Sequence, residues 1–137
     1  MKRFFAVCLL LLLCGCQSAS NLDATCRITV SAQTETLSAE CLELVPENGV
    51  LYSEEVKFAE GEDLLAVMIR AMREANLPLA YEAGFITSIG GLSPGASGPM
   101  SGWMFTVNGE MPMNGCDEIF LSEGDLVEWT YVTEWTE

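Results

Sequence analysis

Carboxylates and cysteines are the side chains in this sequence whose types and spacing could do chemistry. Neighbouring acidic residues, which general acid–base catalysis uses, occur at residues 54–55, 60–63 and 117–118. The chain has no histidine, so it lacks an imidazole base, an imidazole metal ligand and the base of a Ser-His or Cys-His pair. Each acidic group lies in a polar turn or at a helix start, and the spacing of a calcium loop does not occur. We therefore expect neither a catalytic site nor a metal site.

The amino-terminal residues have the pattern of a lipoprotein export signal. A basic start at Lys2 and Arg3 precedes an apolar run at residues 4–13, and Leu-Cys-Gly-Cys follows, ending at Cys16. The run is shorter than the roughly 20 apolar residues that span a bilayer, so it is typical of a cleaved signal. We predict a signal peptide at residues 1–15 and a lipidated Cys16. The alternative is an ordinary cleaved signal peptide.

This signal predicts an extracytoplasmic protein, anchored to the cell membrane by lipid. Residues 16–24 would form the lipidated cysteine and a short polar tether, and residues 25–137 would form one domain. The whole chain has six basic and twenty acidic residues, and removal of Lys2 and Arg3 leaves four basic residues against the same twenty acids. Such a charge excludes nucleic acid as a partner and disfavours adhesion to anionic lipid except through the anchor.

Three cysteines remain beyond the predicted anchor: Cys26, Cys41 and Cys116. An odd number in an oxidising compartment predicts one disulfide and one free thiol. Pairing of Cys26 with Cys41 is the simplest assignment, because it closes a short loop at the start of the domain. The two pairings that involve Cys116 remain open. These cysteines contain no Cys-x-x-Cys spacing, so we expect neither a zinc site nor a thioredoxin-type site.

One helix and several strands must position these side chains. Residues 64–76 repeat apolar side chains at helical spacing, follow a cluster of acids and end before Pro78, which predicts an amphipathic helix. The dipeptide Asn108-Gly109 is typical of a tight hairpin turn, and residues 90–99 form a loop rich in glycine, serine and proline. Alternating or β-branched segments predict strands at residues 27–32, 54–58, 79–89, 103–107 and 126–132. The order predicts an α+β fold, with one amphipathic helix against a mixed sheet.

Two segments resemble the DUF4430 family. Residues 101–135 read SGWMFTVNGEMPMNGCDEIFLSEGDLVEWTYVTEW, and residues 43–49 read ELVPENG. The resemblance covers residues 25–131. The family occurs in bacterial surface lipoproteins and is related to the carboxy-terminal β-domain of transcobalamin and intrinsic factor, the vitamin B12 carriers. The resemblance implies a β-grasp-like α+β domain and a binding module in place of an enzyme.

The resemblance also implies where a ligand would bind. In the vitamin B12 carriers, the segments that correspond to residues 103–112 and to about residues 85–86 face the corrin ring. Aromatic and methionine side chains suit a large, flat, apolar macrocycle. An alternative remains open for Trp103 and Phe105, because both share a face with Val107 and could form core. The ligand-binding residues implied by the resemblance are Phe85, Ile86, Trp103, Phe105, Met111 and Pro112.

These observations predict a lipid-anchored ligand-binding module that captures cobalamin or another corrinoid for uptake, without a tightly bound cofactor. The carriers clamp their ligand between this domain and a helical domain, so we expect a transporter or a helical partner protein to complete the site. Relatives carry a cysteine just before the Gly-Trp-Met element, where this chain has Pro99 and Met100. If Cys116 pairs with that cysteine in relatives, it has lost its partner here. The alternative function is a cell-surface adhesion or scaffold domain that recognises a protein or a cell-wall partner.

Overall fold

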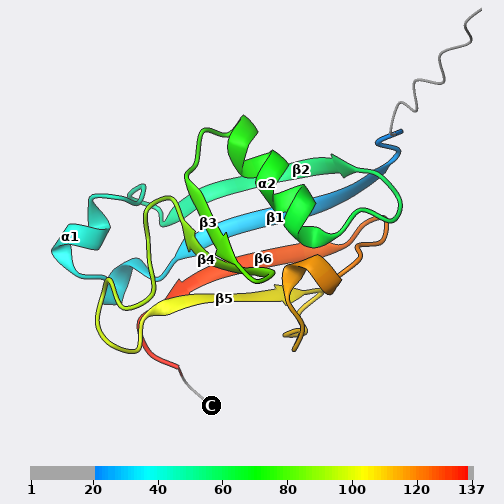
Figure 1. The fold of residues 1–137 in the computed structure, drawn as a ribbon. Helices are drawn as coiled ribbons and strands as arrows, with labels where there is room; N and C mark the ends of the chain where they lie inside the picture. The colour runs from blue at the N-terminus through cyan, green and yellow to red at the C-terminus, as the bar shows by residue number, and fades with distance from the viewer. Residues whose placement is uncertain (1–20, 136–137) are drawn as a thin grey trace, which may run out of the picture.

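A four-stranded mixed sheet forms the centre of the protein (Figure 1). The structure is a computed structural model and describes residues 21–135, so the predicted signal peptide and Cys16 lie outside the described residues. The strands are β1 (Ala24–Ala32), β2 (Val50–Phe58), β5 (Gly102–Val107) and β6 (Leu126–Val132), in the order β2-β1-β6-β5. The first and last strands, β1 and β6, lie parallel at the centre, and β2 and β5 pair with them antiparallel.

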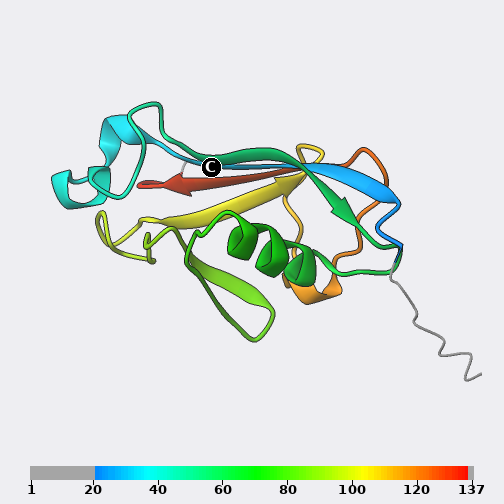
Figure 2. The same cartoon turned by 90° about the horizontal axis from the view of Figure 1, so that it is seen from above.

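A helix and a small hairpin cover one face of this sheet. The helix is α2 (Leu64–Glu74), and β3 (Leu79–Glu82) pairs with β4 (Phe85–Ile89) as a separate two-stranded sheet. Figure 2 shows both on the same side of the main sheet, and no described element covers the other side. The domain is therefore a mixed α+β structure made mostly of sheet. The shorter elements are η1 (Thr34–Thr36), α1 (Ala39–Leu42) and η2 (Cys116–Glu118).

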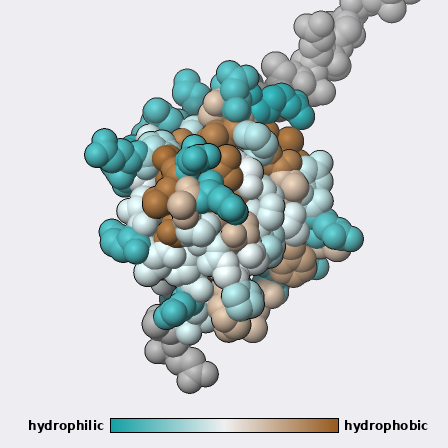
Figure 3. Space-filling view, turned by 90° about the vertical axis from the view of Figure 1, so that its left-hand side faces the viewer, coloured by the Kyte–Doolittle hydropathy of each residue, from teal (hydrophilic) through white to brown (hydrophobic). Residues whose placement is uncertain are grey.

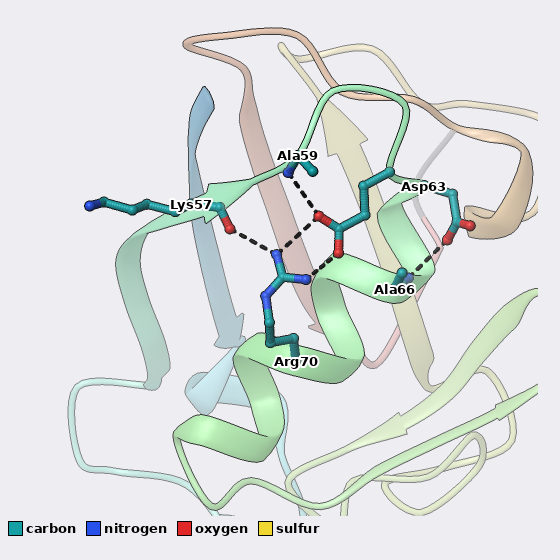
Figure 4. A network of polar contacts seen from close by, with 6 residues as sticks. Lys57, Ala59, Asp63, Ala66 and Arg70 are labelled. Atoms are coloured by element: carbon teal, nitrogen blue, oxygen red, sulfur yellow. Dashed lines mark hydrogen bonds and ion pairs between the residues drawn. The ribbon is translucent and has the colours of Figure 1, made fainter. Parts of the chain in front are cut away.

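Polar contacts hold the first turn of α2 against the end of β2 (Figure 4). Asp63 caps the helix, because its side chain accepts a hydrogen bond from the main-chain N–H of Ala66 at 2.8 Å. Glu62 pairs with Arg70, and its carboxylate also accepts a hydrogen bond from the N–H of Ala59 at 3.0 Å. The guanidinium of Arg70 donates a further bond to the carbonyl oxygen of Lys57 at 2.8 Å. The chain thus enters the helix at a fixed position relative to the sheet.

The core lies between the main sheet and its cover. Alternate residues of β1 and β6 point toward α2, which follows from the two-residue period of a strand. Trp129 pairs with Val30 of β1 on one side and Phe105 of β5 on the other. The fully buried residues of α2 at this interface are Leu64, Val67, Met68, Ala71 and Met72. Burial of this helical stripe explains why residues 64–74 form a helix in place of a strand.

The structure confirms most of the predicted elements and changes their limits. The predicted helix ends at Glu74, and Asn76 adopts a left-handed φ of 56° just beyond it. The second strand begins at Val50 and is longer than predicted. Asn108 and Gly109 form the predicted tight turn, which bridges Val107 to Glu110, but residues 111–115 form a loop and no strand pairs with β5 beyond that bridge; β5 pairs with β6. Within residues 21–135, no helix is long and apolar enough to cross a bilayer.

The predicted Cys26–Cys41 disulfide is not present in the structure, where both cysteines are free and buried. Cys26 lies near the start of β1 in the main core, whereas Cys41 packs against Ala32 at the end of that strand. At about 3.3 Å per strand residue, Cys26 and Ala32 are about 20 Å apart. A disulfide needs Cα atoms within about 7 Å. The extended strand therefore separates the two thiols. Cys116 is also free and buried.

Candidate functional site

Two segments that are distant in the sequence meet at the tip of the β3–β4 hairpin. Ala83 and Gly84 form the turn with left-handed φ angles of 50° and 83°. The carbonyl oxygen of Gly84 accepts a hydrogen bond from the main-chain N–H of Cys116 at 2.8 Å. A Cβ atom at Gly84 would overlap the carboxylate of Asp117, so that side chain would have to turn aside, and the left-handed φ angle also favours glycine there. The hairpin tip is thereby fixed against η2.

Large apolar side chains are exposed on both sides of this junction. Phe85 follows the hairpin turn and is 53% exposed, and Met111 and Met113 in the loop before η2 are 51% and 91% exposed. Pro112 lies between the two methionines and is half-buried. We call Phe85, Met111, Pro112 and Met113 the tip surface. It contains three of the six predicted ligand residues, and it contains Met113, which the sequence interpretation omitted. The signal for Met113 was an apolar side chain in a loop, two residues after Met111.

The other three predicted ligand residues face the core. Ile86 is buried in the main cluster. The indole N–H of Trp103 donates to the carbonyl oxygen of Leu92 at 2.8 Å, and its ring meets Tyr131 edge-on with a centroid distance of 5.3 Å. Phe105 stacks on Trp129 with centroids 4.4 Å apart. Trp103 and Phe105 are only half-buried, so a ligand could reach their exposed edges alone, and their ligand role stays a prediction.

The buried thiols of Cys116, which bonds to the hairpin tip, and of Cys26 in the main core are poor nucleophiles. The pKa of the Cys116 thiol is raised to about 11, chiefly by burial and with a contribution from the neighbouring carboxylate of Asp117. Burial likewise raises the pKa of Cys26 to about 11, with a contribution from Asp125. With these raised pKa values, both thiols are protonated at neutral pH. They are therefore unreactive, because the thiolate is the nucleophilic form. Within the described residues, no group of three or more acidic or cysteine side chains is arranged to hold a metal ion.

The main surface cavities lie away from the predicted ligand residues. The largest of three, about 550 Å³, is lined by residues that include Phe58, Glu60 and Leu121. Two smaller cavities, of about 340 and 310 Å³, lie beside α2 and are lined by residues that include Tyr52 and Tyr81 respectively. None of the three is lined by any of the six predicted ligand residues. The side chains of the tip surface are instead exposed to solvent, as one wall of a binding site would be.

Solved structures share this fold. A haptocorrin chain, from a crystal structure of haptocorrin in complex with Cbi, matches this fold with a TM-score of 0.57 and 17% identity. The match covers 84% of this chain and 27% of the haptocorrin chain. A protein from Ruminococcus gnavus ATCC 29149, to which a metal-binding role is ascribed, matches with a TM-score of 0.50 and 16% identity, over 82% of this chain and 100% of that one. This chain thus spans about a quarter of the haptocorrin chain. At these identities the likeness shows the fold alone.

A comparison with curated proteins gives no match. The family model described as "Domain of unknown function (DUF4430)" matches residues 61–133, which is more than half of the chain. The matched region begins before α2 and ends after β6, so it includes the hairpin, η2 and all of the tip surface. This protein therefore belongs to the DUF4430 family.

Proposed function

We propose that this protein is a lipid-anchored extracytoplasmic module that binds a corrinoid, such as cobalamin, on its tip surface. One observation carries the proposal. The resemblance to vitamin B12 carriers relates residues 85–86 and 103–112 to the corrin ring, and the chain around both is tied together, because Gly84, just before the first segment, is hydrogen-bonded to Cys116, four residues after the second. Phe85 in the first segment and Met111 in the second are both more than half exposed. The shared fold with haptocorrin supports the same class of ligand.

The chemistry of the tip surface suits such a ligand. An aromatic ring offers a flat apolar face, and methionine side chains adapt to irregular apolar shapes. An open surface cannot enclose a ligand, whereas small-molecule sites usually bury most of the ligand surface. We therefore propose that a partner, either a transporter or a helical protein, covers the other side of the corrinoid. Alone, the domain would bind weakly.

The anchor and the fold type belong to the same proposal. Cys16, preceded by the pattern of residues 1–15, would carry the lipid and hold the domain outside the cytoplasmic membrane. The sheet has the order β2-β1-β6-β5 with parallel central strands, and α2 follows β2 in the chain and precedes the remaining strands. This arrangement supports a β-grasp-like classification. Replacement of Cys16 by Ser should release the protein from the membrane fraction, and retention in that fraction would refute the anchor.

The test of ligand binding uses the soluble fragment that begins at Ser18. Every described strand and helix lies between Ala24 and Val132, so this fragment keeps the whole domain. Equilibrium dialysis with cobinamide and cobalamin should give saturable binding, which Phe85→Ala or Met111→Ala weakens at least fivefold. Met100→Ala is the matched control, because Met100 is 56% exposed in the loop before β5. No binding at millimolar ligand, or an equal loss with Met100→Ala, would contradict the proposal.

A different surface supports the alternative function in adhesion. Figure 3 shows a hydrophobic area at the α1 end of the molecule. Leu44, which is 48% exposed, lies beside Gly91, and Leu51 and Leu77 lie beside Gly90, so glycine backbone and leucine side chains form one apolar patch. An exposed patch of this kind is typical of protein recognition. If the protein is an adhesin, Leu44→Glu should reduce its co-sedimentation with purified cell walls, while Phe85→Ala should not.

A further inference from the structure

The part of the chain that forms the tip surface carries no positive charge. After Arg73 the sequence contains no lysine, arginine or histidine, although it continues for the whole of β3 to β6. The basic residues of the described chain lie on β1, on β2 and on α2. They are Arg27, Lys57, Arg70 and Arg73. The hairpin, η2 and the loop between β5 and η2 therefore contribute only negative side-chain charge.

Four carboxylates lie on the segments that carry or adjoin the tip surface, namely the hairpin, the loop before η2 and η2 itself. Glu82 pairs with Phe85 across the hairpin, and Glu110 immediately precedes Met111. The carboxylate of Asp117 lies against Gly84, and Glu118 follows it in η2. All four residues are exposed. The one ion pair in residues 21–135 joins Glu62 to Arg70, so none of the four is neutralised by a described basic side chain.

We infer that the tip surface selects a cationic apolar ligand over an uncharged or anionic one of the same shape. This inference rests on the proposed function and specifies its ligand class. Apolar contact with Phe85 and the two methionines would supply affinity, and the surrounding carboxylates would supply discrimination by charge complementarity. Among corrinoids, the favoured ligand is one whose cobalt carries net positive charge and which lacks the phosphate of the nucleotide loop.

The size of this discrimination follows from screening. The carboxylates are exposed to water, and exposed charges act over a distance of about 10 Å at an ionic strength of 0.1 M. Each therefore contributes little, and the four together should favour a cation by about fivefold at low salt. High salt should remove most of this preference. Direct coordination of cobalt by a protein side chain would persist in high salt, so the salt series separates the two causes.

The experiment compares diaquacobinamide, which is cationic, with dicyanocobinamide, which is uncharged. Binding of both to the fragment from Ser18 is measured by dialysis at 20 and 300 mM NaCl. We expect the cation to bind about fivefold more tightly at low salt and the two to converge at high salt. The triple variant Glu82→Gln, Glu110→Gln, Glu118→Gln should remove most of the preference, because only Asp117 of the four carboxylates remains. Neutralisation of Glu40, Glu43 and Glu47, which lie at the α1 end, should leave it in place.

The outcomes separate this inference from the proposed function. Equal affinity for both cobinamides, or a preference that the triple substitution leaves undiminished, would overturn the charge selection while corrinoid binding stands. Absence of binding by either compound would overturn both. A preference that persists undiminished at 300 mM NaCl would also overturn the inference, because it would assign the difference to cobalt coordination.

Discussion

The main-chain N–H of Cys116 donates a hydrogen bond to the carbonyl oxygen of Gly84, with 2.8 Å between the two atoms. This bond joins the tip of a hairpin that is otherwise a separate sheet to the segment that follows β5. The bonded Gly84 directly precedes Phe85, and the bonded Cys116 lies five residues after Met111 and three after Met113. The proposed site therefore depends on a contact between two turns and not on the regular part of the main sheet.

Substitution of Gly84 tests this contact. Gly84→Ala places a methyl group in the left-handed region and against Asp117, so we expect a loss of about 2–3 kcal/mol in the free energy of unfolding. Gly95→Ala is the control, because Gly95 has a similar φ of 78° but open space around its Cβ position. It should cost about 1 kcal/mol. Urea denaturation measures both, and equal losses would show that the hairpin tip is not packed against Asp117.

The aromatic side chain of Phe105 on β5 should contribute to the stability of the fold. Phe105→Ala removes a ring that stacks on Trp129, and we expect it to lower the free energy of unfolding by about 2–4 kcal/mol. Met104→Ala changes a half-buried neighbour on the opposite face of the strand and should cost less than half as much. Thermal unfolding of the two variants gives the comparison. A Phe105→Ala variant as stable as the parent would mean that the ring is available to a ligand.

The ion pair at the start of α2 should make stability depend on pH. Burial acts to raise the pKa of Glu62, but hydrogen bonds from Arg70 and Ala59 outweigh it and hold the pKa below its ordinary value of 4.5. A lowered folded-state pKa stabilises the protein above the unfolded-state pKa, and that contribution is lost as the pH falls through the folded-state value. Glu62→Gln should therefore cost about 1 kcal/mol at pH 7. Urea titrations at pH 7 and below pH 4 should show the difference between variant and parent shrinking, and a constant difference would contradict the assignment.

The two core thiols should resist modification and destabilise the fold at high pH. The folded-state pKa of Cys26 and Cys116 is about 11, raised by burial from 9.0. A raised pKa contributes stability that is complete below the unfolded-state value and is lost as the pH rises through the folded-state value. Unfolding should become easier between about pH 9 and pH 11. At pH 8 iodoacetamide should label both residues only after denaturation. Mass spectrometry of exported protein that showed a disulfide at either residue would contradict the free-thiol state.

Local patterns predicted the elements, whereas contacts between distant segments decided the site. Residues 64–74 show apolar side chains at helical spacing, and β6 shows alternating buried and exposed side chains. Both patterns can be seen in consecutive residues, so each predicts its own element. The pairing of β5 with β6 across a loop of 18 residues, from 108 to 125, has no local signal. The same limit applies to the bond between Gly84 and Cys116. The spacing of Cys26 and Cys41 likewise does not reveal that the extended β1 separates them, so the sequence predicts a disulfide that the structure does not contain.

The placement of Trp103 shows the limit for individual side chains. Its position on a strand face was predictable, but that face could meet either ligand or core. The choice depended on Leu92 and Tyr131, which lie in other segments and contact the indole. Exposure of Met111 and Met113 likewise follows from a loop that leaves the sheet, which residue type alone does not predict.

Methionine methyl NMR of the fragment from Ser18 tests the tip surface most directly. The fragment contains Met68 and Met72 in the core, Met100 and Met104 away from the hairpin tip, and Met111 and Met113 on the tip surface. Titration with cobinamide should shift the methyl signals of Met111 and Met113 along one saturation curve, while those of Met100 and Met104 stay in place. Shifts centred on Met100 or Met104, or none at millimolar cobinamide, would contradict a corrinoid site at the tip surface.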